Sequence, residues 1–144
     1  MYDPVQQRDL FVCHSSDDAA VATEIVQRLE ALGISCWIAP RDVEPGTSYA
    51  ESLYHAIEKA PVFAVLMSRG ANMSRHVVRE LEIADQMSKR IVPVRLEDFE
   101  ATGAFCYHTR AAHFYAWNEA PEIVLERIAE QVKRAKTAET SLGT

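Results

Sequence analysis

Short apolar runs alternate with amphipathic helical patterns along this chain. The runs are four to six residues long and lie at Leu10–Cys13, Ile34–Ile38, Val62–Met67, Ile91–Val94 and Ala111–Tyr115. Runs of this length are typical of β-strands, and strands that are separated by helices pair in parallel. The alternation therefore predicts an α/β fold built on a parallel sheet.

The third run, Val62–Met67, is apolar at every position. A strand without polar alternation is covered on both faces, so this run belongs in the middle of the sheet. Five β/α units in a chain of this size predict a flavodoxin-like, three-layer sandwich with strand order 2-1-3-4-5 and helices on both faces. Ligands of such sheets bind at the carboxyl ends of the strands near the switch point, here after Cys13 and Met67.

Capping residues and breakers predict where the helices begin and end. The first helix should start after Ser15 or Ser16, whose hydroxyls can cap it, and should stop at Gly33. We expect the next helices over Ser48–Lys59, Ser74–Lys89 and Ala120 to about Lys136. Residues 95–110 lack clear periodicity, which predicts a loop with at most one helical turn.

Length and charge limit the organisation and the partners. The chain has 144 residues and a net charge of -6, which fits one domain without a general attraction to nucleic acid or anionic membranes. We expect residues 1–8 to form an N-terminal leader, residues 9–136 to form the domain, and the small, polar residues 137–144 to form a disordered tail.

The cysteines indicate a reducing compartment. There are three, an odd number, and Cys13 and Cys36 lie in apolar runs where cysteine commonly acts as a small hydrophobic residue. No apolar segment is long enough for a signal core or a membrane span, so we expect a cytoplasmic protein. Cys106, His108 and His113 lie close in sequence, but a second ligand pair at zinc spacing is missing, and we expect no metal site.

Glu80 is the strongest candidate for a chemical role. It follows Val77 by three residues and precedes Ala84 by four, so it lies along the packed flank of the third predicted helix. That position is close to the predicted ligand crevice. Alternatively, Glu80 is one more surface acid beside Arg79 and Glu82.

Other candidates surround the same crevice. His76 lies one helical turn before Glu80, where the two side chains can meet. Ser15 and Ser16 join a strand end to a helix start, a junction that can hold phosphate or ribose, although simple capping explains them equally well. The sequence has neither a G-x-G-x-x-G nor a Walker motif, so any nucleotide must be held by other means.

A proline-punctuated segment leaves the second run. It extends from Trp37 through Ala39–Thr47, called here the 39–47 loop, and a loop of this length beside a ligand edge is a common place for lids and protein contacts. Tyr49 follows at the start of the next helix and offers an aromatic face toward the same side. Packing in the helical core is the alternative role for Tyr49.

Three segments in order resemble Toll/interleukin-1 receptor (TIR) domains, particularly bacterial ones. These segments are Leu10–Ser16, Cys36–Asp42 followed by Pro45 and Gly46, and Ser74–Leu81. The resemblance extends from about Asp9 to Val132 and implies the flavodoxin-like fold that the run pattern predicts. It also implies that the 39–47 loop corresponds to the BB loop, through which TIR domains assemble.

The resemblance further implies an activity. Many bacterial and plant TIR domains cleave NAD at the nicotinamide–ribose bond to release nicotinamide and ADP-ribose or a cyclic isomer. A glutamate on the third helix is essential in those enzymes, and Glu80 matches it. NAD+ is then a substrate and no cofactor is needed. We expect the substrate contacts to be Ser15, Ser16, Trp37, Tyr49 and His76.

The proposed chemistry needs one carboxylate. Nicotinamide leaves as a neutral base from a cationic nucleotide, so no acid has to protonate it, and Glu80 can steady the oxocarbenium-like charge. The sequence departs from the family at His76, where NAD-cleaving members often carry tryptophan. A histidine ring can also stack on a nucleotide.

Two functional hypotheses follow. The first is an NAD-cleaving enzyme of bacterial immune (anti-phage) signalling, which is activated by self-assembly and acts with a sensor domain or partner protein. The second is a non-catalytic adaptor that acts through TIR–TIR contacts of the 39–47 loop, which His76 in place of tryptophan favours. A phosphoacceptor receiver domain is excluded, because Met67-Ser68 and Tyr115-Ala116 stand where it needs aspartate and lysine.

Overall fold

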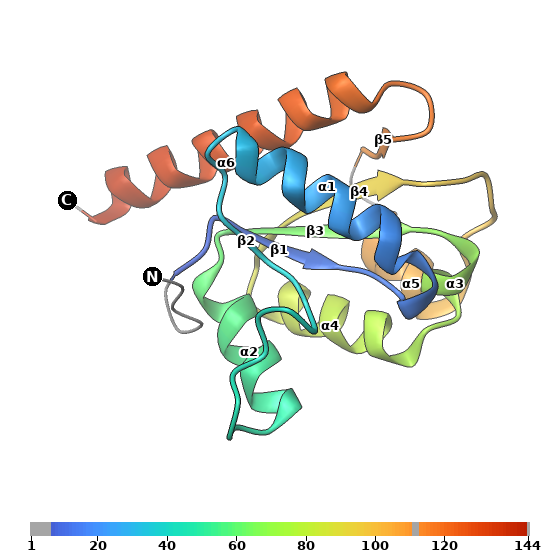
Figure 1. Cartoon of the computed structure of the whole chain (residues 1–144), viewed down its shortest axis with the longest axis horizontal. Helices are drawn as coiled ribbons and strands as arrows, with labels where there is room; N and C mark the ends of the chain where they lie inside the picture. The colour runs from blue at the N-terminus through green and yellow to red at the C-terminus, as the bar shows by residue number, and fades with distance from the viewer. Residues whose placement is uncertain (1–6, 111–112, 144) are drawn as a thin grey trace.

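A five-stranded parallel sheet forms the centre of the protein (Figure 1). The computed structural model describes residues 7–110 and 113–143. Within them the strands lie in the order β2-β1-β3-β4-β5, and each neighbouring pair is parallel. Their bounds are Leu10–Cys13 for β1, Cys36–Trp37 for β2, Val62–Met67 for β3, Arg90–Arg95 for β4 and Tyr115–Ala116 for β5. The predicted order 2-1-3-4-5 is confirmed.

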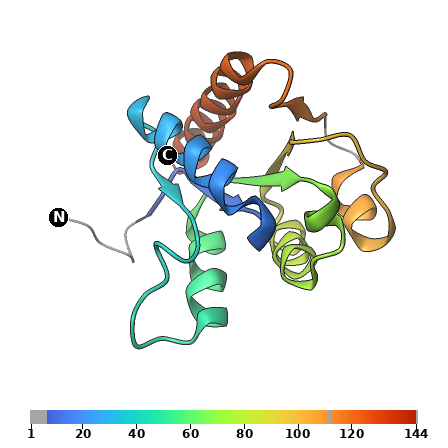
Figure 2. The same cartoon turned by 45° about the vertical axis from the view of Figure 1, so that its right-hand side comes forward.

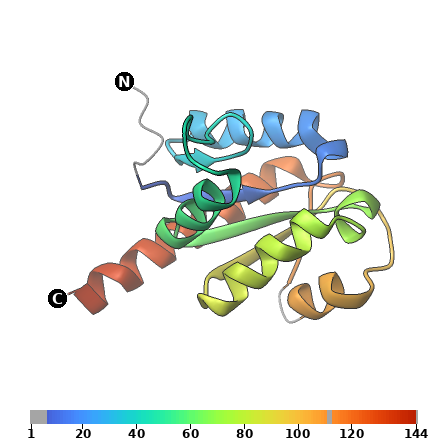
Figure 3. The ribbon, with the colours of Figure 1, turned by 90° about the horizontal axis from the view of Figure 1, so that it is seen from below.

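Helices cover both faces of this sheet. They are the 3-10 helix η1 (Ser16–Asp18), α1 (Ala19–Ala31), α2 (Tyr49–Lys59), α3 (Arg69–Asn72), α4 (Arg75–Gln86), α5 (Gly103–Thr109) and α6 (Pro121–Gly143). Helices α1 and α6 lie on one face, whereas α2, α4 and α5 lie on the other (Figures 1 and 2). Seen from below, α2 and α4 lie in front of the sheet (Figure 3). The three-layer architecture is therefore as predicted.

Alternation along β1 divides the core into two halves. Leu10 and Val12 pack with α1 and α6, and Phe11 and Cys13 pack with α2 and α4. All six residues of β3 are buried, as its continuous apolar pattern predicts for a central strand. On the α2 and α4 face, the ring of Phe11 stacks between those of Trp37 and Phe63, with centroids 5.1 Å and 5.2 Å away.

Caps fix several helix ends. Ser48 accepts a hydrogen bond from the Glu51 N–H, and Ser74 accepts one from the Val77 N–H, as expected for α2 and α4. Gly33 follows the end of α1 and has a φ of +88°, which confirms the predicted stop of this helix. The predicted serine cap of the first helix is wrong, because Ser15 makes no side-chain cap bond and η1 precedes α1.

The predicted elements differ from the structure where short stretches pack locally. β2 and β5 have two residues each, and Ala111 and Ala112 of the fifth run lie outside the described residues. Helix α5 replaces residues 103–109 of the predicted loop, and Phe105 within this helix is fully buried beside Phe99. The one-turn helix α3 was not predicted; Ser68 caps it by accepting from the Ala71 N–H.

Helix α6 continues beyond its predicted end at Lys136. Residues 137–143, predicted to be a disordered tail, are helical up to Gly143. No proline or glycine interrupts this segment before Gly143, and the hydroxyl of Thr137 donates to the Lys133 carbonyl within the helix. At the other end, residues 1–6 of the predicted leader lie outside the described residues, and Arg8 is buried. In the described part of the chain, no helix has the length and apolar character that a membrane span requires.

Candidate functional site

A pocket opens at the carboxyl ends of β1 and β2, where the loop after β1 faces the starts of α2 and α4. Its volume is about 250 Å³. The six residues predicted from the sequence all line it: Ser15, Ser16, Trp37, Tyr49, His76 and Glu80. Of the segment after β3, also expected at the ligand edge, Ser74 at the start of α4 lines the pocket. The structure thus brings the six residues together, while their roles toward a substrate stay predictions.

Glu80 is the acid of this pocket. Its side chain lies on the buried face of α4 with Val77, Leu81 and Ala84, and the residue is only 8% exposed. Glu82 on the same helix is exposed. The alternative of a surface acid therefore does not hold for Glu80. A buried acid at a pocket is a feature of functional sites.

Burial also changes the proton affinity of Glu80. Removal from water raises its pKa to about 7, and a hydrogen bond from the Cys13 thiol acts in the opposite direction. Burial likewise raises the pKa of Tyr49, and the nearby charge of Glu80 adds to that effect. Near neutral pH both forms of Glu80 are populated, so the group can exchange a proton in a reaction.

Ser15 is engaged within the protein. Its hydroxyl donates to the Asp18 carboxylate at 2.8 Å, and the Ser68 hydroxyl at the end of β3 donates to the same oxygen. Gly70 lies so close that a Cβ there would be 3.1 Å from the Ser15 oxygen. Ser15, 5% exposed, therefore ties the loop after β1 to the end of β3. Ser16 lies beside it and is exposed at the pocket.

The three ring side chains have different environments. Trp37 is 2% exposed and stacks on Phe11, so it forms a wall of the pocket as part of the core. Tyr49 is 48% exposed at the first turn of α2, which excludes core packing as its main role. His76 is exposed at the first turn of α4. Tyr49 and His76 are thus the rings available at the mouth.

The sequence analysis missed two neighbours of these residues. Cys13 was interpreted as a small hydrophobic residue, and it is buried, but its thiol also lowers the pKa of Glu80 and donates to the Val77 carbonyl at 4.0 Å. His14 lines the pocket and contacts the carbonyl oxygens of Ser15 at 2.8 Å and Ala39 at 3.1 Å. The strand–helix junction pointed to this segment, but no local pattern indicates a contact across 25 residues.

Ion pairs hold the middle of the 39–47 loop. Asp42 is 1% exposed and accepts hydrogen bonds from the Ile38 N–H at 2.8 Å and from Arg41. Arg41 also binds both carboxylate oxygens of Glu30 on α1, each at 2.9 Å. The pairing of Arg41 with Asp42 considered from the sequence is present. The loop is fastened to α1 beside the pocket.

A second cavity of about 300 Å³ lies between the 39–47 loop and α2. Trp37 lines both cavities and separates them. The second cavity carries side chains of both charge signs, including Glu51 and Lys59 of α2. Glu80 does not line it, so we place the candidate chemistry in the first pocket.

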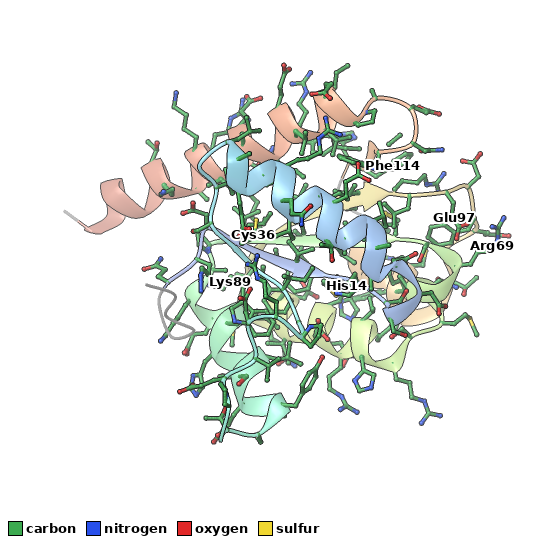
Figure 4. The ribbon with its side chains drawn as sticks, in the orientation of Figure 1. His14, Cys36, Arg69, Lys89, Glu97 and Phe114 are labelled. Atoms are coloured by element: carbon green, nitrogen blue, oxygen red, sulfur yellow. The ribbon has the colours of Figure 1, made fainter. Side chains whose placement is uncertain are left out.

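No metal centre is formed by the residues that the structure describes, since no group of three or more His, Cys, Asp or Glu side chains could hold an ion there. Of the residues weighed for zinc, His108 lies 3.0 Å from the Asp85 carboxylate on α4. At the carboxyl ends of β3 and β4, Arg69 pairs with Glu97 and joins the segments that follow these two strands (Figure 4).

Comparison with known proteins identifies the kind of domain that the sequence segments resemble. A family model described as a TIR domain matches residues 10–128. The TIR domain of the Toll-related receptor TRR-2 from Hydra magnipapillata has a similar structure, with TM-score 0.75 and 23% identity over 88% of this chain and 98% of that one. No match was found among the curated proteins.

Two further solved structures share the fold. The TIR domains of the activated Roq1 resistosome match with TM-score 0.58 and 17% identity, over 89% of this chain and 82% of that one. A TIR-STING receptor from C. gigas in complex with 2',3'-cGAMP matches with TM-score 0.70 and 20% identity, over 89% of this chain but 41% of that one. At these identities the similarity shows the fold.

Proposed function

We propose, from the premise that this chain belongs to the TIR domain family, that it cleaves NAD+ at the nicotinamide–ribose bond with Glu80 as its catalytic residue. The products would be nicotinamide and ADP-ribose or a cyclic isomer. The observation that carries the proposal is an acid only 8% exposed that lines a pocket beside Tyr49 and His76. As the family resemblance implies, we assign the activity to bacterial anti-phage signalling, with self-assembly as its trigger.

The position of Glu80 suits this reaction. As the bond to nicotinamide breaks, positive charge develops on the ribose, and a carboxylate in a water-poor pocket stabilises that charge strongly. Water or another atom of the same nucleotide then attacks the ribose carbon. When water attacks, it loses a proton, which a carboxylate with a pKa of about 7 can accept and pass to solvent.

The size of the pocket bears on how NAD+ would bind. A volume of about 250 Å³ is below the roughly 300–1,000 Å³ of sites that enclose a drug-sized ligand. A dinucleotide would therefore extend from the pocket across the exposed rings of Tyr49 and His76. This partial enclosure supports activation by assembly, because a neighbouring molecule could cover the protruding part.

The direct test compares three proteins with NAD+ at high protein concentration. Wild type and Glu82→Gln, the matched control on the exposed face of α4, should release nicotinamide, and Glu80→Gln should release at least about 100-fold less. Chromatography of nicotinamide and ADP-ribose products gives the measurement. Equal release by Glu80→Gln, or none from wild type in enforced assemblies, would refute the proposal.

A second function is favoured by one specific departure. His76 stands where NAD-cleaving relatives often carry tryptophan, which fits a non-catalytic adaptor acting through the 39–47 loop. Under that function, substitutions in the loop abolish TIR–TIR association, whereas no variant or wild type releases nicotinamide. Association measured by light scattering, together with the chromatographic assay, separates the two functions.

A further inference from the structure

His14 has an unusual environment in the Glu80 pocket. Both nitrogens of its ring face backbone carbonyl oxygens: Nδ1 lies 2.8 Å from the Ser15 oxygen, and Nε2 lies 3.1 Å from the Ala39 oxygen. The ring is half-buried and lines the pocket. Figure 4 labels His14 between the ribbons of α1 and α4. Because each ring nitrogen lies beside a carbonyl oxygen, the ring contacts the backbone of two segments.

The two carbonyls belong to different walls of the pocket. The Ser15 oxygen also accepts a hydrogen bond from the Asp18 N–H at 3.0 Å, so it is part of the turn that starts η1. Ala39 is the first residue of the 39–47 loop, and Ala39 and Pro40 are the part of that loop that lines the pocket. The ring of His14 therefore spans from one wall to the other.

The other ties of the loop lie farther along it. Asp42 and Arg41 fasten its middle to Ile38 and to Glu30 of α1. Pro40 accepts a hydrogen bond from the Val43 N–H within the loop, whereas the contact of Ala39 with the loop after β1 is the one that His14 makes. Such a contact contributes little to the stability of the whole fold, but it sets the width of the pocket.

We propose that His14 is a positioning residue, whose hydrogen bond to the Ala39 carbonyl holds the start of the 39–47 loop against the loop after β1 and so fixes the width of the Glu80 pocket. The inference is structural, and only its kinetic consequence rests on the proposed function. A carbonyl oxygen only accepts, so the proposed contact requires the tautomer that carries the proton on Nε2, which then donates to the Ala39 carbonyl.

Two isosteric variants separate the two contacts. The amide nitrogen of asparagine at position 14 reaches the place of Nδ1 and can donate to the Ser15 carbonyl alone. The amide nitrogen of glutamine reaches the place of Nε2 and can donate to the Ala39 carbonyl. If the link to Ala39 matters, His14→Gln should resemble wild type, and His14→Asn should resemble His14→Ala. His113→Ala, an exposed histidine between α5 and β5, is the matched control.

Amide hydrogen exchange of the protein without substrate measures the link directly. The Asp42 and Val43 N–H groups are hydrogen-bonded inside the loop and report its opening. We expect their exchange to be about tenfold faster in His14→Asn and within about twofold of wild type in His14→Gln, with α6 unchanged in both. Equal exchange in the Asn and Gln variants overturns the inference, and it does so even if His14→Ala fails to fold.

Kinetics supply a readout that separates this inference from the proposed function. With NAD+, we expect His14→Asn to raise KM about fivefold to tenfold with a smaller change in kcat, and His14→Gln to restore KM. A KM that is unchanged in His14→Asn contradicts a role in fixing the pocket. If wild type releases no nicotinamide, the proposed function fails, and the exchange measurement still decides the role of His14.

Discussion

Replacement of Glu80 by glutamine should stabilise the fold at alkaline pH. The wild-type carboxyl group is 8% exposed, and burial raises its pKa from 4.5 to about 7. Between these two values the unfolded chain loses its proton while the folded protein retains it. The stability of wild type therefore falls as the pH rises through about 7. Glutamine has a similar shape and no charge, so it does not undergo this loss.

The magnitude follows from the pKa difference. At about 1.4 kcal/mol for each pKa unit, the difference between 4.5 and about 7 corresponds to about 3 kcal/mol. By linkage, the wild type has lost about 1 kcal/mol of stability at pH 5 and nearly the full amount at pH 8. With a urea m-value of about 2 kcal/mol/M, Glu80→Gln should raise the unfolding midpoint by roughly 1.5 M at pH 8 and by roughly 0.5 M at pH 5.

Urea unfolding of both proteins at the two pH values provides the assay. Glu82→Gln changes an exposed acid on the same helix and should leave the midpoint nearly unchanged at both values. The reasoning is refuted if the advantage of Glu80→Gln is the same at pH 5 and pH 8, because a difference without pH dependence cannot come from a desolvated carboxylate.

Further predictions concern catalysis and the 39–47 loop. The kcat/KM for NAD+ should rise with pH through about 7 as the Glu80 carboxylate forms. In Cys13→Ala the midpoint of this rise should move to higher pH, because the Cys13 thiol lowers the pKa of Glu80. A Cys13→Ala profile identical to that of wild type would contradict this role of the thiol. Asp42→Ala should lower the free energy of unfolding by about 2 kcal/mol, since it leaves the Ile38 N–H without this acceptor, whereas Asp98→Ala, which removes a solvent-exposed pair, should change it by less than about 0.5 kcal/mol. Equal losses in the two urea titrations would show that the buried carboxylate is not a support of the loop.

The sequence predicts elements well where one pattern dominates a segment. The bounds of β1 and β3 agree with the apolar runs, because both strands are buried throughout and polar residues or breakers flank them. The stop of α1 at Gly33 agrees because a positive φ favours glycine there. Such features depend on near neighbours in the chain.

The features that the sequence did not predict depend on distant contacts. Helix α5 is held against the protein by Phe105, which is buried beside Phe99, and no periodic pattern in the sequence predicts this contact. In the pocket, Glu80 could be placed on the packed flank of its helix because its spacing from Val77 and Ala84 is local, whereas its catalytic role was implied by the family resemblance. The contact of His14 with Ala39 joins residues 25 apart, and the loop conformation that creates it exists only in the folded chain.

The surroundings of Glu80 indicate which part of the site is prepared in a single molecule. Position 80 lies among buried apolar residues of α4, where an acid costs stability and an apolar residue would not. Around it, Ser15 and Ser68 converge on Asp18, and separate ties fasten the 39–47 loop, so both walls are fixed before any ligand binds. The rings of Tyr49 and His76, in contrast, are exposed. If NAD+ is the substrate as proposed, we expect one molecule to hold the ribose end in place and a second molecule to cover the rest.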